Sequence, residues 1–426
     1  MKQYIVDKKR EIEGVELVPR DLEIGKTREF VITIIGPRRS GKTFFLYDII
    51  KRLNLEEKDY VFVNFEDDEV KSLKREEKTK FIDYHRELYG TGPKFIFLDE
   101  IQNLERWDSF LYSLVEKKKY HIFATGSSSK LLSKEIATQL RGRAISVAVF
   151  PFSFKEFLRV KNFELRLPLS SKDISKVKHF LLNYIDTGGF PQVVLNKIGK
   201  KEFFREYLNV VLYRDLVERF KIENIDAMRF LMLSIVQSNA KEFSLNRTYK
   251  QIKEKIPVGN KTLYMYSKLL EESIFCFYLY RFNWSLKKAL LTIPKVYVVD
   301  PGIYTHYFGR EIGKLIENVV FLELKKKELR NDIELFYFKD QKCEVDFVTK
   351  ENNRVKQLIQ VAYASSFNEI DKREIRALLH AKELFKEHKP ELLVITWDYE
   401  DEKELSWFGK KGKIKFIPLW KWLINI

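Results

Sequence analysis

Residues 36–43 read Gly36-Pro37-Arg38-Arg39-Ser40-Gly41-Lys42-Thr43, which matches the pattern G-x-x-x-x-G-K-[ST] of a phosphate-binding loop. Residues 30–35 before it are rich in β-branched side chains and read as a buried strand. Residues 43–51 after it read as an amphipathic helix. The two glycines let the backbone wrap around a phosphate, toward which successive N–H groups and the helix N-terminus point. The pattern therefore predicts a nucleotide-phosphate site.

This loop supplies the expected cofactor-binding residues, with Phe44 as the last of the set. Lys42 is expected to reach the β- and γ-phosphates of ATP, and the Thr43 hydroxyl is expected to ligate Mg²⁺. ATP or ADP with Mg²⁺ is therefore the predicted ligand. The loop residues assigned to it are Gly36, Pro37, Arg38, Arg39, Ser40, Gly41, Lys42, Thr43 and Phe44.

Two acids follow a second hydrophobic run. Residues 94–98 read as a buried strand that leads into Asp99 and Glu100. In ATPases of this kind the first acid holds the Mg²⁺ shell and the second orients the attacking water, so we assign these roles to Asp99 and Glu100. A plain strand end is the alternative, and the position downstream of the loop favours the catalytic pair.

Two further groups are candidates for the same site. A third strand-like run, residues 120–126, leads into hydroxyl side chains, and Thr125 and Ser127 could sense the γ-phosphate or the water, although such residues are also common in turns. Arg141 and Arg143 come just before the last core strand, where an arginine can reach the γ-phosphate of a neighbouring subunit. A surface arginine bound to its own helix end is the alternative for each.

Composition limits the class of protein. The 426 residues are too many for one core, so two or three domains are expected. No apolar run approaches the ~18 residues of a membrane helix, and the amino terminus lacks the apolar stretch of a signal peptide. Two distant cysteines exclude a disulfide framework and suit a reducing cytosol, so we expect a cytoplasmic protein.

The net charge of +16 is uneven. Residues 1–160 carry a net +4, and the remainder carries +12. A basic excess beyond the nucleotide site permits an acidic partner such as nucleic acid, and a dispersed solvated surface is the equal alternative.

The order of strand-like and helical runs predicts the fold. Strand-like runs at 29–35, 60–65, 95–100, 121–126 and 144–150 alternate with helical patterns at 42–53, 71–89, 105–118 and 129–140. Such alternation predicts a parallel sheet covered on both faces, with nucleotide at the carboxyl ends of the strands. The extra strand between the loop and the acidic strand resembles the AAA+ branch of P-loop proteins. We expect a P-loop ATPase core over residues 1–160 and a helical lid over 161–235, broken at residues 187–191.

Residues 236–305 are expected to form a winged-helix-like domain. Residues 244–248 could cap a helix from Tyr249 to Lys255, and a turn follows at 257–260. A second helix spans 261–272, and two strand-like runs follow at 274–282 and 295–299. Residues 241–290 hold 10 Lys and Arg against 4 acids. The second helix could enter the major groove of double-stranded DNA through Lys261, Thr262, Tyr264 and Lys268, although winged helices also dock proteins.

The motifs, taken together, resemble one family. They are 36–43, 97–102, 125–129, 141–143, 150–157, 188–191, 213–216 and 313–318, and they occur in that order over nearly the whole chain. The chain resembles the prokaryotic, largely archaeal, AAA+-like ATPases that carry a C-terminal domain of unknown function. The resemblance implies that residues 306–426 form an α/β domain similar to the restriction-endonuclease-like fold.

A nuclease site of that type needs an acid on one strand and Glu-x-Lys on the next. Glu317 and Asp346 could supply acids, but Gln360 stands at the glutamate position and Ala362 at the lysine position. A neutral amide is a poor ligand for a hard cation and alanine carries no charge, although Lys342 could substitute. We therefore expect a catalytically degenerate domain.

These observations predict an ATP-binding, Mg²⁺-dependent ATPase that acts as a nucleotide-driven conformational switch, with DNA as a candidate client. An ATP-dependent DNA nuclease and a regulatory scaffold with a protein client are the alternatives. A homo-oligomer is compatible with the arginine pair, and no membrane association is expected.

Overall fold

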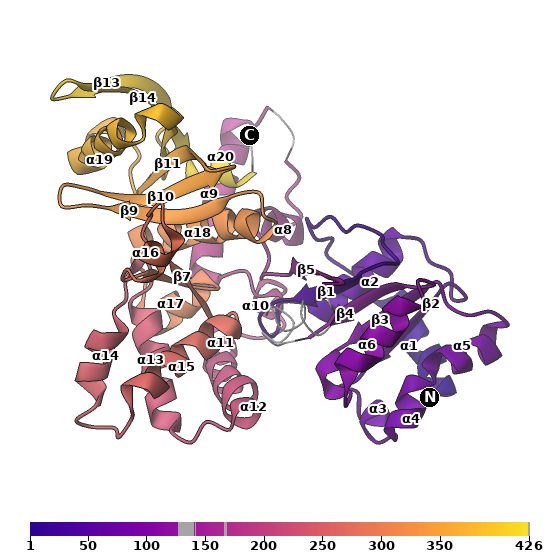
Figure 1. The fold of residues 1–426 in the computed structure, drawn as a ribbon. Coiled ribbons are helices and arrows are strands. Elements are labelled where there is room, and N and C mark those ends of the chain that lie inside the picture. The colour runs from indigo at the N-terminus through magenta and orange to yellow at the C-terminus, as the bar shows by residue number, and fades with distance from the viewer. Residues whose placement is uncertain (127–139, 141, 166–167, 425–426) are drawn as a thin grey trace. The chain divides into compact units, whose positions relative to one another are not determined.

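The computed structural model describes residues 1–126, 140, 142–165 and 168–424, and these residues form two compact units (Figure 1). Unit 1 consists of Met1–Pro151 with Glu272–Ile274, and unit 2 consists of Phe152–Glu271 with Phe275–Ile426. Among the helices in the described part of the chain, none has the length and hydropathy that a membrane-spanning helix requires.

Unit 1 is built around a parallel sheet of five strands in the order β2-β3-β4-β1-β5. The strands are β1 (Val31–Ile35), β2 (Tyr60–Asn64), β3 (Phe95–Asp99), β4 (His121–Thr125) and β5 (Ala144–Ala148). The helices are α1 (Lys2–Gly14), α2 (Lys42–Arg52), α3 (Asp68–Lys71), α4 (Arg75–Thr79), α5 (Phe81–Tyr89) and α6 (Trp107–Glu116), with a 3₁₀ turn η1 (Ile101–Asn103). The predicted parallel α/β sheet is confirmed.

Both faces of this sheet are covered, because successive side chains of a strand point to opposite faces. Ile32 and Ile34 of β1 lie in a core with Phe45 and Leu46 of α2. Val31 and Ile35 lie in a second core with residues of α1, α5 and α6. Strands β1 to β4 are almost entirely buried, as the continuous apolar runs predict for a parallel sheet, whereas the edge strand β5 has no fully buried residue.

The single helix expected over residues 71–89 is wrong. The chain forms three short helices there, α3, α4 and α5. Residues 74–80 are all polar, and α4 has no buried residue. Without an apolar stripe to bury, this segment has no packing to keep it continuous with α5. The helix expected at 129–140 falls, except for Leu140, outside the described residues.

Unit 2 begins with helices, as predicted. They are α8 (Phe154–Val160), α9 (Ser171–Thr187), α10 (Pro191–Val194), α11 (Lys200–Val210), a π-helical segment η3 (Val211–Val217), α12 (Glu218–Phe220) and α13 (Ile225–Gln237). The predicted break falls between α9 and α10. A side chain at Gly188, where φ is +76°, would overlap the Asp300 carboxylate, and one at Gly189 would lie 2.3 Å from the Phe152 carbonyl oxygen.

A three-stranded antiparallel sheet follows, in the order β6-β8-β7. Its strands are β6 (Lys241–Glu242), β7 (Cys276–Leu279) and β8 (Lys295–Val298), and the helices between them are α14 (Leu245–Ile252), α15 (Asn260–Glu272) and α16 (Leu286–Leu290). Ser244 caps α14, because its side chain accepts a hydrogen bond from the Arg247 N–H, and the helix therefore begins at Leu245, four residues before the predicted start at Tyr249, and ends at Ile252. Helix α17 (Pro301–Phe308) then leads to the last part of the chain.

The carboxyl-terminal part is a mixed six-stranded sheet in the order β13-β14-β12-β11-β10-β9. Its elements are α18 (Ile312–Leu329), β9 (Glu334–Lys339), β10 (Glu344–Glu351), β11 (Arg354–Ala362), α19 (Lys372–Leu384), β12 (Glu391–Thr396), β13 (Asp401–Trp407), β14 (Lys410–Pro418) and α20 (Leu419–Ile424), with 3₁₀ turns η4 (Phe367–Glu369) and η5 (Lys386–His388). Strands β9, β10 and β11 form an antiparallel meander, and β11 pairs in parallel with β12 after α19. The hairpin β13–β14 has no counterpart among the predicted strands.

Candidate functional site: the phosphate-binding loop of unit 1

The loop predicted from residues 36–43 lies between β1 and α2. Gly36 has no room for a side chain, because a Cβ atom there would lie 2.2 Å from the Val149 carbonyl oxygen. Gly41 precedes α2 as its N-cap with φ +94°, a conformation that favours glycine. The first turn of α2 contains no acidic residue. The N–H groups at this helix N-terminus carry partial positive charge, which favours an anion there.

Lys42 and Ser40 line this loop from within. Lys42 is 6% exposed, and its Nζ donates to the carbonyl oxygens of Gly36 (3.2 Å) and Pro37 (3.1 Å). Ser40 is fully buried, and its Oγ has no hydrogen-bond partner among the described residues. A buried donor without a partner fits a loop shaped for an oxygen-rich ligand.

Asp99 is the centre of the polar contacts at the ends of β3 and β4. Its Oδ2 accepts a hydrogen bond from Thr43 Oγ1 (2.7 Å), and its Oδ1 accepts one from Thr125 Oγ1. Asp99 is fully buried, and this burial, with the nearby Glu100 carboxylate, raises its pKa to about 6. The structure thus brings together three residues that the sequence assigns to one site.

Glu100 adopts a left-handed backbone conformation with φ +50° directly after β3. Its N–H donates to Thr125 Oγ1 (3.0 Å), and its Oε2 accepts a hydrogen bond from Gln102 Nε2. Thr125 therefore connects both acids. The sequence predicted only that its hydroxyl lies at a strand end, and the structure adds these two partners. Gln102 was not assigned a role, because a lone glutamine after the acids carries no signal of its own.

The remaining predicted loop residues differ in exposure. Pro37 is buried, Arg38 and Arg39 are half-buried, and Phe44 is 47% exposed on the first turn of α2. The backbone of Arg39 has φ +64°, which helps the loop to turn. Each contributes to the shape of the loop.

Arg143 lies away from the loop of its own chain. It precedes β5, and its carbonyl oxygen accepts a hydrogen bond from Val31 N–H (2.9 Å) at the start of β1, whereas the loop follows the end of β1. Five residues of strand separate the two ends by roughly 16 Å. The Arg143 guanidinium binds Glu116 at the end of α6. A contact with the phosphate of a neighbouring subunit stays a prediction, and Arg141 and Ser127 lie outside the described residues.

Arg20 supports the loop from the side of the protein interior, and sequence analysis missed it. It is 7% exposed, and its guanidinium donates to the carbonyl oxygens of Ser40 (3.5 Å) and Phe150. The backbone N–H of Arg20 donates to Asp48 Oδ2 (3.3 Å) on α2. Arg20 lies in a stretch without periodicity, so no pattern marks it.

This arrangement fits a nucleotide with Mg²⁺. The loop offers N–H groups, Lys42 and a buried hydroxyl to phosphate oxygens. Thr43 Oγ1 and the Asp99 carboxylate are hard oxygen ligands that lie side by side, which is the donor type that Mg²⁺ prefers. The residues present therefore match the predicted ligand chemistry.

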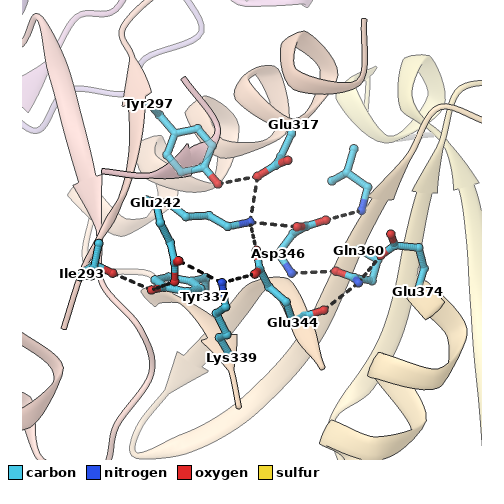
Figure 2. A network of polar contacts seen from close by, with 12 residues as sticks. Glu242, Ile293, Tyr297, Glu317, Tyr337, Lys339, Glu344, Asp346, Gln360 and Glu374 are labelled. Atoms are coloured by element: carbon cyan, nitrogen blue, oxygen red, sulfur yellow. Dashed lines mark hydrogen bonds and ion pairs between the residues drawn. The ribbon is translucent and has the colours of Figure 1, made fainter. Parts of the chain in front are cut away.

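Unit 2 holds a second polar cluster, at α18, β8 and β10 (Figure 2). Glu317 and Asp346, the two predicted acids, both contact Lys295 Nζ, at 3.3 and 3.1 Å. Gln360 does not join them at that nitrogen: its Oε1 accepts from Asp346 N–H (2.7 Å), and its Nε2 donates to the Glu344 carbonyl oxygen (3.1 Å) and to Glu374. Lys342, the suggested substitute, is exposed in the β9–β10 turn, and Ala362 ends β11. Lys295 was not predicted.

Charge and burial in this cluster act against each other. Burial raises the pKa of Glu317 to about 7, although Lys295 acts in the opposite direction. Burial acts to lower the pKa of Lys295, whereas the carboxylates of Glu317 and Asp346 act to raise it. The effect of the carboxylates is larger, so the pKa of Lys295 is raised. The carboxylates around Lys295 therefore favour its charged form.

Asp340, Cys343 and His380 form a third cluster, with possible ligand atoms within 4.8 Å of one another. Both ring nitrogens of His380 are already engaged, Nε2 with Asp340 Oδ2 (2.9 Å) and Nδ1 with Lys410 Nζ (2.6 Å). Because the ammonium of Lys410 donates to Nδ1, the proton of the ring lies on Nε2, and no lone pair is left for a metal. This cluster is a complete hydrogen-bond chain.

Comparison with known proteins agrees with this description. The model of an AAA domain matches residues 28–158, and models of two domains of unknown function, DUF8612 and DUF4143, match residues 178–312 and 312–422. The chain is 34% identical over 429 residues to "Uncharacterized protein MJ1544" of Methanocaldococcus jannaschii, with 99% of this chain and 95% of the relative covered. It is 26% identical over 408 residues to an uncharacterized protein of Haemophilus influenzae, with 94% and 96% covered.

Among solved structures, the Walker-type ATPase PABY2304 of Pyrococcus abyssi is similar at 14% identity and a TM-score of 0.40, over 72% of this chain and 94% of that chain. The predicted AAA-type domain with a C-terminal domain of unknown function is confirmed. The similarity to MJ1544 over almost the full length shows that the chain belongs to the same family as MJ1544, and this member joins an AAA domain to a DUF4143 domain.

Proposed function

We propose that the protein is a Mg²⁺-dependent ATPase that works as a nucleotide-driven conformational switch. One observation carries this proposal: Thr43 of the loop, Asp99 at the end of β3 and Thr125 at the end of β4 form one hydrogen-bonded chain beside Lys42. Three segments distant in sequence would have little reason to converge around a buried carboxylate without a ligand to hold. The AAA domain match supports nucleotide binding.

Each residue has a separate task in this proposal. The loop N–H groups and Lys42 hold the β- and γ-phosphates. When nucleotide binds, Lys42 Nζ gives up its hydrogen bonds to the Gly36 and Pro37 carbonyl oxygens and donates to phosphate oxygens instead. Mg²⁺, when held by Thr43 and Asp99, would neutralise charge on the phosphate oxygens. Glu100 orients the water that attacks the γ-phosphate in line, and Thr125 fixes the backbone from which Glu100 projects.

ATP and ADP would favour different arrangements of the rest of the chain. Such a switch is only as strong as the difference in affinity of the two arrangements for the nucleotide. We propose the division into an ATPase core (1–160), a helical lid (161–235), a winged-helix-like domain (236–305) and a nuclease-like domain (306–426). The hydrogen bond from Gln102 to Glu100 is a candidate for a contact that breaks when ATP binds, because the attacking water would compete for the same Glu100 carboxylate.

The test separates binding from hydrolysis. Lys42→Ala is expected to lose ATP binding, as measured with a fluorescent nucleotide, because the loop loses its cation. Glu100→Gln is expected to bind ATP and lose hydrolysis, as measured by phosphate release. Turnover that is unchanged in Lys42→Ala would exclude this loop as the site.

DNA is the client that unit 2 supports best. The element order helix, strand, two helices, strand, short helix, strand, with the sheet order β6-β8-β7, supports a winged-helix-like domain. One face of α15 is exposed, and it carries Lys261, Tyr264, Met265 and Lys268, which follow the i, i+3, i+4, i+7 spacing of a helix face. Arg247 and Lys250 of α14 are also exposed. A cationic and aromatic helix face is suited to a DNA groove.

Affinity for double-stranded DNA tests this proposal. Lys261→Glu with Lys268→Glu should strongly weaken binding and make its decrease with salt less steep. The matched control is Lys117→Glu with Lys119→Glu, which makes the same charge change at exposed positions of unit 1. Equal loss in both double variants, or in neither, would favour the regulatory scaffold with a protein client.

We propose that the C-terminal domain does not cleave DNA. The order α18, β9, β10, β11, α19, β12 supports a nuclease-like core, and the absence of Glu-x-Lys from β11 speaks against activity. Cleavage of supercoiled DNA in the presence of Mg²⁺ or Mn²⁺, lost in Asp346→Asn, would restore the nuclease alternative.

A further inference from the structure

Three carboxylates from two separate elements converge on one ammonium group. Lys295 Nζ lies 3.3 Å from Glu317 Oε1, 2.9 Å from Glu344 Oε1 and 3.1 Å from Asp346 Oδ1. Lys295 is 3% exposed, and Tyr297 of the same strand donates to the same Glu317 oxygen (2.7 Å). Figure 2 shows Glu317, Glu344 and Asp346 joined by dashed lines to this one nitrogen. A cation therefore occupies the focus of the acidic cluster, and it belongs to the chain itself.

Glu317, on α18, and Asp346, on β10, are the two acids that the sequence suggested for a metal site, and Glu344 lies beside them on β10. Lys295 comes from β8, outside the six-stranded sheet. A divalent cation bound by these oxygens at about 2.0–2.6 Å would lie almost on the ammonium nitrogen, and the two positive charges would repel each other. The lysine and a metal ion thus exclude each other.

Strand β8 cannot easily withdraw the lysine. The Val298 N–H donates to Asn239 Oδ1 (3.0 Å), and Asn318 Nδ2 donates to the Val298 carbonyl oxygen (2.9 Å). Asn318 follows Glu317 directly in α18. Two neighbouring residues of this helix therefore bind β8, Asn318 through the Val298 carbonyl oxygen and Glu317 through the Lys295 side chain. Asn239 and Asn318, which hold Val298, are fully buried, and the Glu317 side chain is 16% exposed.

We propose that the Lys295 ammonium permanently replaces a divalent cation in the DUF4143 domain, so that the acidic cluster is a metal-independent joint between β8 and the elements α18 and β10. A second contact of the same kind supports the joint: Lys339 of β9 binds Glu242 of β6 and Glu344 of β10, each at 3.0 Å. The three-stranded sheet with α14 and α15 then moves together with the C-terminal sheet. The absence of the Glu-x-Lys pair from β11 agrees with this proposal, because a site that holds a lysine in place of a metal ion cannot carry out metal-dependent cleavage.

Binding of Mn²⁺ by the full-length protein tests this proposal. The Asp99→Asn substitution is included in every sample to remove the other candidate metal ligand. The chain with Lys295 is expected to bind no Mn²⁺ at the cluster. Lys295→Met, which keeps the length and loses the charge, is expected to gain one site per chain and to lose it again when Glu317→Gln is added. Lys339→Met, at the rim of the cluster, is the matched control and should gain no site.

Two results would overturn the proposal. One is Mn²⁺ binding by the chain with Lys295 that disappears in Glu317→Gln, and the other is a folded Lys295→Met chain without a new site. If Lys295→Met does not fold, the triple variant Lys295→Met, Glu317→Gln, Asp346→Asn decides, because it removes the surplus negative charge. A folded triple variant would show that Lys295→Met fails because its acidic cluster lacks a cation, which supports the proposal. An unfolded triple variant would show that the cation is not what the cluster needs, which contradicts it.

Discussion

Replacement of Asp99 by asparagine should separate the stability of unit 1 from its activity. Asp99 is fully buried and accepts hydrogen bonds from Thr43 and Thr125. Burial raises its pKa to about 6 from an ordinary value of 3.8, so its ionisation costs stability. The stability that protonated Asp99 contributes is fully present below pH 3.8 and is lost as the pH rises through about 6.

The size of the effect follows from this difference. About two pKa units correspond to about 3 kcal/mol of ionisation penalty at pH 8, and about half of that is already present at pH 5. Asparagine never ionises, and it exchanges one acceptor for a donor, which weakens one hydroxyl contact by about 1 kcal/mol. Asp99→Asn should therefore exceed the wild type in stability by roughly 2 kcal/mol at pH 8 and by much less at pH 5.

Urea unfolding of the wild type and Asp99→Asn at both pH values measures this difference, and phosphate release measures the expected loss of Mg²⁺-dependent hydrolysis. The matched control is Asp48→Asn, because Asp48 is also buried but pairs with Arg52 at 2.5 Å. It should lower stability by about 1–3 kcal/mol, because Arg52 loses its ion pair with the buried carboxylate. If the stability of Asp99→Asn runs parallel to that of the wild type between pH 5 and 8, the reasoning about the buried carboxylate is refuted.

Three further predictions concern stability and the loop. Gly189→Ala should destabilise unit 2 by about 1–3 kcal/mol or more in thermal unfolding, because its Cβ would lie 2.3 Å from the Phe152 carbonyl oxygen, whereas Gly199→Ala, with nothing within 4 Å, should be close to neutral. Glu374→Gln should gain stability over the wild type as the pH rises from 5 to 8, by at most about 3 kcal/mol, because burial and Asp346 raise the pKa of Glu374 to about 7 from 4.5; a constant difference across this pH range would contradict it. Arg20→Lys should weaken ATP binding and lower stability by about 1–3 kcal/mol, because lysine cannot reach both the Ser40 and Phe150 carbonyl groups; unchanged nucleotide affinity would show that Arg20 does not support the loop.

The nucleotide site was predictable because its chemistry is written in short segments. Two glycines, Lys42 and Thr43 must be neighbours in sequence for one loop to surround a phosphate, and Asp99 must end a buried strand. Thr125 followed from its place at the end of the next strand. Its two contacts, to Asp99 and to the Glu100 N–H, depend on the strand order and needed the structure.

Lys295 was not predictable from its surroundings in sequence. Its partners Glu317 and Asp346 lie 22 and 51 residues away, and a lysine that begins a strand is usually a solvated end. Asp300 is a similar case: it accepts the Gly189 N–H, 111 residues away, and so explains why a turn motif in the helical part needs glycines.

The hairpin β13–β14 was missed for a different reason. Alternate residues of β14, Lys411, Lys413 and Lys415, are exposed, while Ile414 and Phe416, each of which follows one of these lysines, are buried. The high charge hides a period-2 pattern that is plain once the buried face is known. Helix α1 was missed likewise, because only four of its thirteen residues are buried.

Hydrolysis of ATP by the purified full-length chain, compared with Lys42→Ala and Glu100→Gln, tests the central claim most directly. We expect Mg²⁺-dependent phosphate release by the wild type, loss of both binding and release in Lys42→Ala, and binding without release in Glu100→Gln. Release that persists in Lys42→Ala, or a wild-type chain that binds no nucleotide in the presence of Mg²⁺, would contradict the account.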